Sequence, residues 1–359
     1  MKCIDNKDNS KNKIVKDIKH IYPYMTSIST YKKNELCEIL DKECNIGGLQ
    51  NNQNSCYFDS FLVGLFHYSD NKLLLMLKKS KKFNVNNSKL IGIADQILNE
   101  FEILSKSILK QEKNQCSNLR LLFSQYDTVY SNEISDLKTN KLNWKSSQLE
   151  PSDIIKFLNR VFKIPDNVKY SFESFGTNST AKNPSKSKLT PVSTKEKYTD
   201  FAGISIDSDV LFNAESTVLL NDYIPRYKSD ILFESKSDYW KPKRNLIFKR
   251  KIEKYKYLSA NFLFIHINRI FIDKKITKNI DVPLKLKLKE NKRNLYLRSI
   301  IVHHGGSNGG HYTTMIECKG TWYHFDDMNS GLDKIGDYED LKKYQNGYVF
   351  KNCTDLVYI

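Results

Sequence analysis

A single cysteine at the start of an apolar helical pattern is the feature that most constrains how this chain can fold and act. The polar, glycine-led segment 48–55 runs directly into Cys56. Apolar residues then recur at the spacing of one buried helix face, at Phe58, Phe61, Leu62, Leu65 and Phe66. A cysteine in the first turn of a helix lies at the positive end of the helix dipole, which favours the reactive thiolate. The pattern therefore predicts a helix that begins near Cys56 and carries a reactive thiol.

A second group of reactive side chains surrounds His311, far along the chain. Residues 311–326 alternate as two strands joined by a short connector that fits a tight turn. If the turn is centred in that connector, His311 lies opposite position 328, and Asp326 is a diagonal neighbour on the same face. Asp327 would then point to the opposite face. A shift of one residue in the register would exchange the two acids, so the choice between them depends on the turn.

These residues together supply the chemistry of a thiol protease. Cys56 would attack a carbonyl carbon to form a thioester, and His311 would take the thiol proton and later protonate the leaving amine. Asp326 would hold the imidazole in the useful tautomer. The oxyanion of the tetrahedral intermediate needs hydrogen-bond donors, for which the backbone amide of Cys56 and the side chain of Asn51 are candidates. Taken singly, each residue is more commonly structural; the hypothesis depends on their occurring together in the right order.

The composition argues against several other classes of protein. Hydrophobic residues make up 40% of the 359 residues, enough for a substantial core, and no apolar run is long enough for a membrane span. The N-terminus lacks the apolar stretch of a secretory signal. Seven cysteines without a CxxC pair argue against a disulfide framework and a cysteine-rich zinc site. We therefore expect a reducing compartment, the cytoplasm or alternatively the nucleus, and no metal or cofactor.

The net charge of +16 suggests nucleic-acid binding at first sight. Lysine is nevertheless spread along the whole chain, together with abundant asparagine and isoleucine. The densest clusters, at 78–82 and 241–256, match no nucleic-acid-binding motif. A solvated basic surface explains this pattern better, so we expect no nucleic-acid partner.

The chain divides into a helical front half and a sheet-rich back half, which predicts an α+β fold. Residues 1–44 are polar and predict an N-terminal extension, while residues 45–359 predict one catalytic domain. Within that domain, residues 171–200 are rich in Ser, Thr, Lys, Asn and Pro and predict a flexible insertion loop. Helical spacing is clearest at 89–109 and from Pro151 onward, and β-type alternation at 261–268 and 295–303.

The segment around Cys56 resembles the cysteine motif of the ubiquitin-specific protease family of deubiquitinases, which are papain-like thiol enzymes. That motif has the form G-L-x-N-x-G-x-T-C-Y, with matches at Gly48, Leu49, Asn51, Cys56 and Tyr57. Gln53 stands in place of a usual glycine and Ser55 in place of a usual threonine. The stretch 54–60 is most similar to the cylindromatosis-type branch of the family.

The back half carries the more extensive resemblance. Residues 295–312 (LYLRSIIVHHGGSNGGHY) are similar to the family's run Y-x-L-x-x-V-V-x-H-x-G-x-x-x-x-G-H-Y. Residues 322–327 match W-x-x-F-D-D, whose first acid is the family's third catalytic residue and falls on Asp326. The segment 348–358 corresponds to the family's closing strands. The resemblance covers residues 45–359.

The resemblance implies a papain-like fold with a helical thumb and a β-rich palm, and ubiquitin or ubiquitin-conjugated proteins as partners, cleaved after the C-terminal diglycine. Because the family's paired CxxC zinc site is absent, it also implies a reduced or metal-free fingers region. Asp153, in a segment similar to Q-Q-D-x-x-E-F-L, would contact the substrate. Gly309 and Gly310 would admit the diglycine backbone beside His311 and Tyr312.

Two alternatives stay open at the level of sequence. The departures from the family pattern at Gln53 and around Asp153 suit a noncatalytic ubiquitin-binding module built on the same fold. The same chemistry would also serve a thiol protease that acts on another ubiquitin-like modifier. Labelling of Cys56 by reactive modifier probes separates these alternatives.

Overall fold

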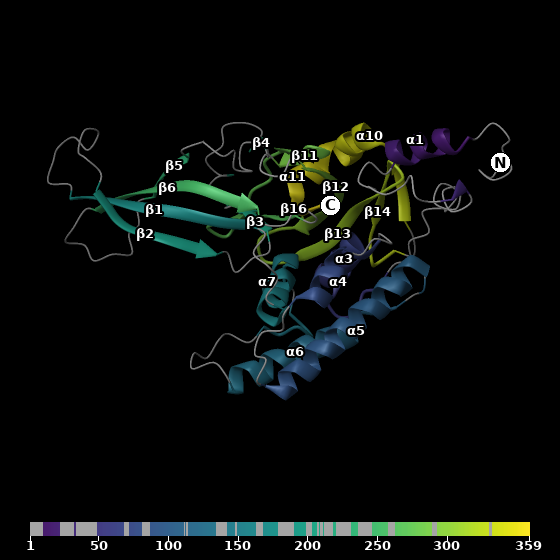
Figure 1. The fold of residues 1–359 in the computed structure, drawn as a ribbon, viewed down its shortest axis with the longest axis horizontal. Helices are drawn as coiled ribbons and strands as arrows, with labels where there is room; N and C mark the ends of the chain where they lie inside the picture. The colour runs from purple at the N-terminus through teal and green to yellow at the C-terminus, as the bar shows by residue number, and fades with distance from the viewer. Residues whose placement is uncertain are drawn as a thin grey trace.

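An eight-stranded sheet with helices packed on both faces forms the centre of the molecule (Figure 1). The structure is a computed structural model. It describes residues 10–21, 32–33, 49–67, 72–80, 87–110, 112, 114–133, 142–147, 149–162, 168–178, 190–198, 203–206, 208, 211, 218–219, 231–235, 246–257, 263–288, 293–329 and 332–359.

The central sheet has the strand order β15-β14-β13-β12-β16-β7-β3, with β11 also paired to β12. Its strands are β3 (Gly203–Ile206), β7 (Leu263–Ile267), β11 (Lys285–Leu288), β12 (Arg293–Gly305), β13 (Gly310–Cys318), β14 (Thr321–Phe325), β15 (Leu332–Gly336) and β16 (Cys353–Tyr358). Neighbours are antiparallel except β3 and β7, which are parallel. Because successive strand residues face opposite sides, Phe264 and Val357 join one hydrophobic core while Ile265 and Leu356 join another on the opposite face.

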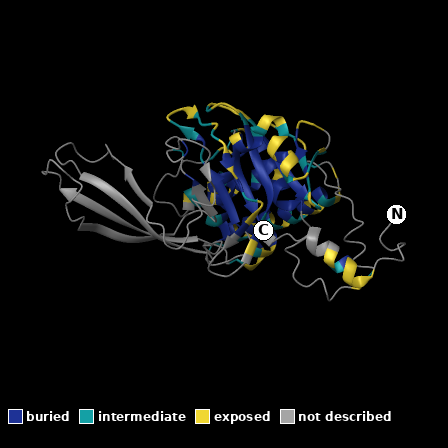
Figure 2. Cartoon of the chain, turned by 90° about the horizontal axis from the view of Figure 1, so that it is seen from above, coloured by how far each residue is buried: buried dark blue, intermediate teal, exposed yellow. Residues whose placement is uncertain are grey.

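The helices of the front half cover the first of these faces. They are α3 (Cys56–Phe66), α4 (Lys72–Lys79), α5 (Ser88–Lys110), α6 (Ser117–Glu133) and α7 (Pro151–Phe162). All residues of α3 are buried, because the helix is apolar around most of its circumference and lies between the sheet and the other helices (Figure 1). Figure 2 shows the buried residues gathered in the interior, with exposed residues around them. Aromatic rings of α3 and its neighbours pack against one another, edge to face or stacked: Phe58, Phe123, Trp144 and Phe157. The predicted helix starts at Cys56 and Pro151 are both confirmed.

The opposite face is covered by the short helices α10 (Tyr338–Lys343) and α11 (Tyr348–Asn352), joined by the 3-10 turn η4 (Tyr344–Gly347). The closing strands expected over 348–358 are therefore wrong for the first five positions, and only β16 is extended. Gly347 adopts a left-handed φ of 74°, which starts the new helix. That helix buries Val349 and Phe350 in the second core, so packing favours it over a longer strand.

A second sheet forms where the sequence predicts a flexible loop at 171–200. Its strands are β1 (Val168–Asn178), β2 (Thr190–Tyr198), β5 (Ile231–Ser235) and β6 (Leu246–Tyr257), in the antiparallel order β2-β1-β6-β5. In Figure 1 it lies to one side of the central sheet. The loop prediction is wrong for 171–178 and 190–198, because β1 and β2 pair along their length with each other and β1 also pairs with the distant β6; positions 179–189 and 199–200 lie outside the described residues. Polar composition alone does not reveal such a partner.

The remaining described elements are short. They are α1 (Lys11–Ile21) in the predicted N-terminal extension, the parallel pair β4 (Val218–Leu219) and β10 (Ile280–Asp281), and the antiparallel pair β8 (Ile270–Phe271) and β9 (Lys274–Lys275). Most of the predicted extension 1–44 lies outside the described residues. None of the helices in the described ranges combines the length and apolar character needed to span a bilayer.

Cysteine pairing differs in one position from the expectation. Cys56, Cys116 and Cys353 are free and buried, as the cysteine pattern predicts. Cys318 is disulfide-bonded. Spacing along the chain carries no sign of this bond, because its residues need only meet in space.

Candidate active site

Cys56 is placed by the loop that precedes α3. The carbonyl of Ser55 accepts hydrogen bonds from the N–H groups of Phe58 (2.7 Å) and Asp59 (2.9 Å), which starts the helix. The hydroxyl of Ser55 accepts from the backbone N–H of Asn52 at 2.7 Å, which closes the loop on itself. Cys56 therefore occupies the first helical position, where its own backbone N–H has no partner within the helix.

Arg120 of α6 fixes this loop from behind. Its buried guanidinium donates to the carbonyl oxygens of Asn52 (2.7 Å) and Gln53 (3.0 Å) in the loop. It also donates to the carbonyls of Trp144 (2.6 Å) and Lys145 (2.5 Å). The fork of donors thus ties the segment before Cys56 to a neighbouring loop and satisfies carbonyls that the turn leaves unpaired.

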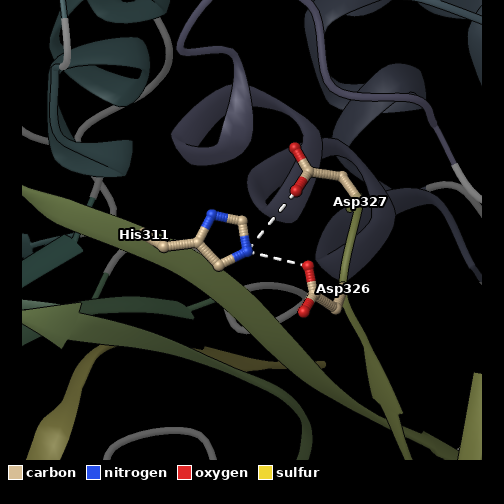
Figure 3. Close-up of side chains that lie close together, drawn as sticks. All are labelled: His311, Asp326 and Asp327. Carbon is tan, nitrogen blue, oxygen red and sulfur yellow. Dashed lines mark hydrogen bonds and ion pairs between the residues drawn. The ribbon is translucent and has the colours of Figure 1, made fainter. Parts of the chain in front are cut away.

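His311 and Asp326 meet on the hairpin as the sequence predicts. Thr314 pairs with Phe325 and Cys318 with Thr321, so the turn is centred between the two residues after Cys318. The Nε2 atom of His311 lies 2.8 Å from Oδ1 of Asp326 (Figure 3). Asp326 is itself held by the backbone N–H of Met328 at 3.0 Å. The imidazole is therefore oriented by a carboxylate whose own position is fixed.

Asp327 does not point away from His311, contrary to the sequence expectation. Its Oδ1 lies 3.6 Å from Nε2 of His311, so both acids flank the same nitrogen (Figure 3). The alternation fails because β14 ends at Phe325, and the chain turns before Asp327. Oδ2 of Asp327 accepts from Nδ2 of Asn51 at 2.8 Å, and the carbonyl of Asp327 accepts from the N–H of Asn51 at 3.3 Å. Asn51 is thereby attached to the hairpin that carries His311.

The thiol of Cys56 lies against the imidazole of His311. A hydrogen bond between them is the largest influence that raises the pKa of His311, to about 9, against the opposing effect of burial; the hydrogen bond to Asp326 raises it further. Burial works against ionisation of Asp326, but hydrogen bonds from Met328 and His311 leave its pKa below the ordinary value. At neutral pH the imidazole is therefore protonated between a thiol group and a carboxylate, the arrangement of an activated cysteine nucleophile.

Among the described residues, His311, Asp326 and Asp327 form a group that could hold a metal ion. Ligand atoms of His311, Asp326 and Asp327 lie within 4.8 Å of one another. The nitrogen that would ligate the ion is, however, the one that contacts the carboxylates and orients the ring toward Cys56. The two acids thus serve to orient and charge the histidine.

The glycine-rich turn between β12 and β13 is shaped by its own packing. A Cβ added at Gly310 would lie 1.9 Å from the carbonyl oxygen of His304, so only glycine fits there. Gly305 adopts a φ of 111°, and its carbonyl accepts from Nζ of Lys275 at 3.0 Å. Nothing lies within 4 Å of a Cβ added at Gly306, which leaves that part of the turn open. Gly310 is thus required by the turn itself, a reason that the sequence does not reveal.

A cavity of about 170 Å³ lies beside this turn. Its lining includes Gly309 and Tyr312 together with Glu150, His266 and Asp355. His266 is held by Asp355 at 2.8 Å, and burial opposes its charge while Asp355 raises its pKa. Two of the predicted substrate-binding residues, Gly309 and Tyr312, therefore line the same cavity, whose lining also includes the acids Glu150 and Asp355.

Asp153 is not among the described residues that line this cavity. It lies on the first turn of α7, where it accepts from the backbone N–H of Glu150 at 3.2 Å and pairs with Lys156 at 3.1 Å. It thus supports a residue of the cavity wall instead of facing the cavity.

Two residues of the site escaped the sequence analysis. Arg120 lies far from Cys56 in the sequence, and no local pattern marks it. Asp59 could have been found, because an acid on a helix that is otherwise apolar must have a buried partner.

Comparison with known proteins decides which family carries this arrangement. The family model for ubiquitin carboxyl-terminal hydrolases matches residues 47–350. The chain belongs to this family. It is a cysteine-type ubiquitin hydrolase, and the predicted mixed helix and sheet fold of the papain-like class is confirmed.

Among solved structures, the hydrolase is similar to the SAGA DUB module of Ubp8, Sgf11, Sus1 and Sgf73 bound to monoubiquitin. The identity is 17% and the TM-score 0.48, over 89% of this chain and 70% of that one. A comparison with curated proteins found no match.

Proposed function

We propose that this hydrolase cleaves the peptide or isopeptide bond after the C-terminal diglycine of ubiquitin, through a triad of Cys56, His311 and Asp326. The observation that carries the proposal is the position of the His311 imidazole, hydrogen-bonded to the thiol of Cys56 and to the carboxylate of Asp326. Ubiquitin and ubiquitin-conjugated proteins are the partners that this reaction requires. Residues 45–359 form the catalytic domain in this proposal.

Acylation begins with transfer of the thiol proton of Cys56 to His311, the base that lies against the sulfur. The sulfur of Cys56 bonds to the carbonyl carbon of the last glycine, and the negative charge moves to the carbonyl oxygen. The backbone N–H of Cys56 and the side-chain amide of Asn51 are the proposed donors to that oxygen. The carbon–nitrogen bond then breaks, and the proton of His311 passes to the leaving amine.

Deacylation uses the same groups in the reverse sense. His311, now neutral, takes a proton from a water molecule, whose oxygen bonds to the thioester carbon. The carbon–sulfur bond breaks, which releases ubiquitin as the free acid and restores the thiolate beside the imidazolium. Asp326 keeps Nε2 of His311 occupied, so that the other ring nitrogen serves the thiol in both half-reactions.

The remaining proposals concern substrate and setting. Gly309, Gly310 and Tyr312 would border the path of the diglycine, with Asp153 supporting Glu150 in the lining of the same cavity. The similarity of residues 54–60 supports assignment to the cylindromatosis-type branch. The free thiols of Cys56, Cys116 and Cys353, three of the four cysteines that the structure describes, support the cytoplasm or the nucleus as the location.

The test is turnover of a ubiquitin C-terminal amide reporter by the purified chain. Cys56→Ala should abolish release of the fluorophore, while Cys353→Ala, which removes another free and buried thiol, should retain it. A folded protein that binds ubiquitin without labelling of Cys56 by a reactive ubiquitin probe would instead be a noncatalytic module. Labelling by probes of other modifiers alone would reassign the substrate.

A further inference from the structure

A buried acid lies one helical turn beyond the nucleophile. Asp59 of α3 has no exposed surface, and every neighbour on its helix is also buried. Its Oδ2 accepts a hydrogen bond from the hydroxyl of Ser55. Its Oδ1 has no donor among the described residues, and it is shielded from solvent. An ionised carboxylate in this position would leave a lone pair unsatisfied at considerable cost.

Asp327, which follows β14, also has a buried carboxylate oxygen without a hydrogen-bond donor among the described residues. Its side chain is fully buried, and Oδ2 accepts from Asn51 at 2.8 Å. Oδ1 likewise has no hydrogen-bond donor among the described residues, because Nε2 of His311 at 3.6 Å is too distant. Two buried carboxyl groups thus each have one unsatisfied oxygen.

The two carboxyl groups interact directly, and one proton between them would satisfy both. Burial raises the pKa of Asp59 well above its usual range, and the negative charge of Asp327 raises it further, which outweighs the hydrogen bonds from Ser55 and Cys116 that lower it. Burial also raises the pKa of Asp327, but the hydrogen bond from Asp59 and the charge of His311 lower it. The proton therefore lies on Asp59, and the charge on Asp327.

We propose that Asp59 is a neutral carboxyl group that donates a hydrogen bond to Asp327 and thereby holds Asn51 in place as an oxyanion donor beside Cys56. The inference rests on the proposed function of Asn51. An asparagine amide has two hydrogens. Asp327 engages one of them at 2.8 Å, which fixes the plane of the amide and leaves the other hydrogen for the substrate oxygen.

Asp59 acts in this account as a positioning residue. It joins the helix of the nucleophile to the hairpin of the base, and it closes a chain of contacts from Ser55 through Asp327 to Asn51. Its charge has no part in the mechanism; only its proton and its shape do. This separates the proposal from an ionised Asp59 whose negative charge is needed.

The decisive comparison is between Asp59→Asn and Asp59→Ala, assayed with the ubiquitin amide reporter. Asparagine has the same shape, is neutral, donates toward Asp327 and accepts from Ser55, so kcat should stay within about threefold of wild type. Alanine removes the donor, so kcat should fall by about 10²-fold, the usual effect of losing an oxyanion donor, with KM little changed. Asp281→Asn and Asp281→Ala, at an exposed acid of β10, are the matched controls.

The double variant Asn51→Ala with Asp59→Ala tests whether Asp59 acts through Asn51. If it does, the double variant loses little more kcat than Asn51→Ala alone, whereas independent, multiplying losses overturn the proposal. The proposal is also overturned if folded Asp59→Asn is as impaired as Asp59→Ala, or if Asp59→Ala keeps full kcat. An inactive wild type whose Cys56 resists a ubiquitin probe would be a failure of the proposed function instead.

Infrared spectroscopy provides a test that needs neither turnover nor a stable alanine variant. The wild-type protein at neutral pH should show the carbonyl stretch of a protonated, buried carboxyl group, and Asp59→Asn should lack that band. A wild-type spectrum without the band would contradict a neutral Asp59.

Discussion

Replacement of Arg120 by methionine is the sharpest test of how the loop before Cys56 is held. Methionine keeps much of the length and apolar stem of the side chain and removes only the guanidinium. Four carbonyl oxygens then lose a charged donor, two in the loop at Asn52 and Gln53 and two in the neighbouring segment at Trp144 and Lys145. The change therefore loosens the loop without emptying the core.

The expected loss of stability follows from where these oxygens lie. The bond to the Trp144 carbonyl is buried and has a charged donor, and this oxygen keeps only the longer bond from the hydroxyl of Tyr57 at 3.4 Å, so the loss costs about 2 kcal/mol. The other three bonds are only partly buried, and water can replace the donor at about 0.5 kcal/mol each. Removal of the guanidinium also removes the cost of burying its charge, which offsets part of these losses. The expected net loss of stability is therefore about 3 kcal/mol. Arg120→Lys keeps the charge but not the fork, and should lose about half as much.

Denaturant unfolding and reporter kinetics together decide the matter. Arg120→Met should lower kcat/KM by at least about tenfold under conditions where the protein stays folded, because Cys56 and Asn51 are both positioned by this loop. The kcat/KM of Arg120→Lys should lie between those of the wild type and Arg120→Met. A methionine variant that loses stability while kcat/KM is unchanged would show that the hydrogen bonds of Arg120 support only the fold. Unchanged stability would refute the energetic reasoning.

Three further outcomes follow from single residues. Activity on amide-linked ubiquitin should decline as pH rises through about 9, because His311 then loses the proton for the leaving amine. Asp326→Asn should move this alkaline limb of the pH–kcat/KM profile to lower pH. An unmoved limb would contradict the assignment of the limb to His311. Gln53 adopts a left-handed φ of 51°, which strains a residue that has a side chain. Gln53→Gly relieves this strain but increases the entropy of the unfolded chain, so the free energy of unfolding by denaturant should rise by about 0.5 kcal/mol. A clear decrease would count against strain at this position. Burial lowers the pKa of His67 from its ordinary 6.5 to about 3, so the unfolded chain binds the proton first and stability should fall by about 2 kcal/mol between pH 6.5 and 5. His67→Gln should reduce that acid sensitivity in melts at the two pH values, and an equal slope in both proteins would exclude this histidine as the cause.

Local sequence patterns were sufficient for the elements that carry the reacting groups. The polar-to-apolar transition placed the start of α3 at Cys56, and counting outward from the hairpin turn placed Asp326 beside His311. Both inferences use spacing along one strand, turn or helix, where geometry is fixed by the backbone. The register held because Lys319 and Gly320 occupy the turn in left-handed conformations.

Other parts of the site depend on contacts that no local pattern contains. Asp327 faces His311 because β14 ends one residue earlier than simple alternation assumes. The sheet containing β1 and β2 escaped notice because β1 pairs with β6, far along the chain. Arg120 is visible only when the loop that it holds is already in place. These features belong to tertiary packing, which overrides local propensity.

The complete enclosure of α3 has a consequence for how this enzyme can be switched on and off. A helix wedged between a sheet and a bundle cannot slide or tilt without opening both interiors. The sulfur is therefore a fixed point, and any reversible loss of activity must come from its surroundings: the segment that bears Asn51, or the segment after Phe325 that bears Asp326 and Asp327. A regulator that binds this hydrolase would therefore act on one of these two segments, and the nucleophile would keep its position while the segment moves.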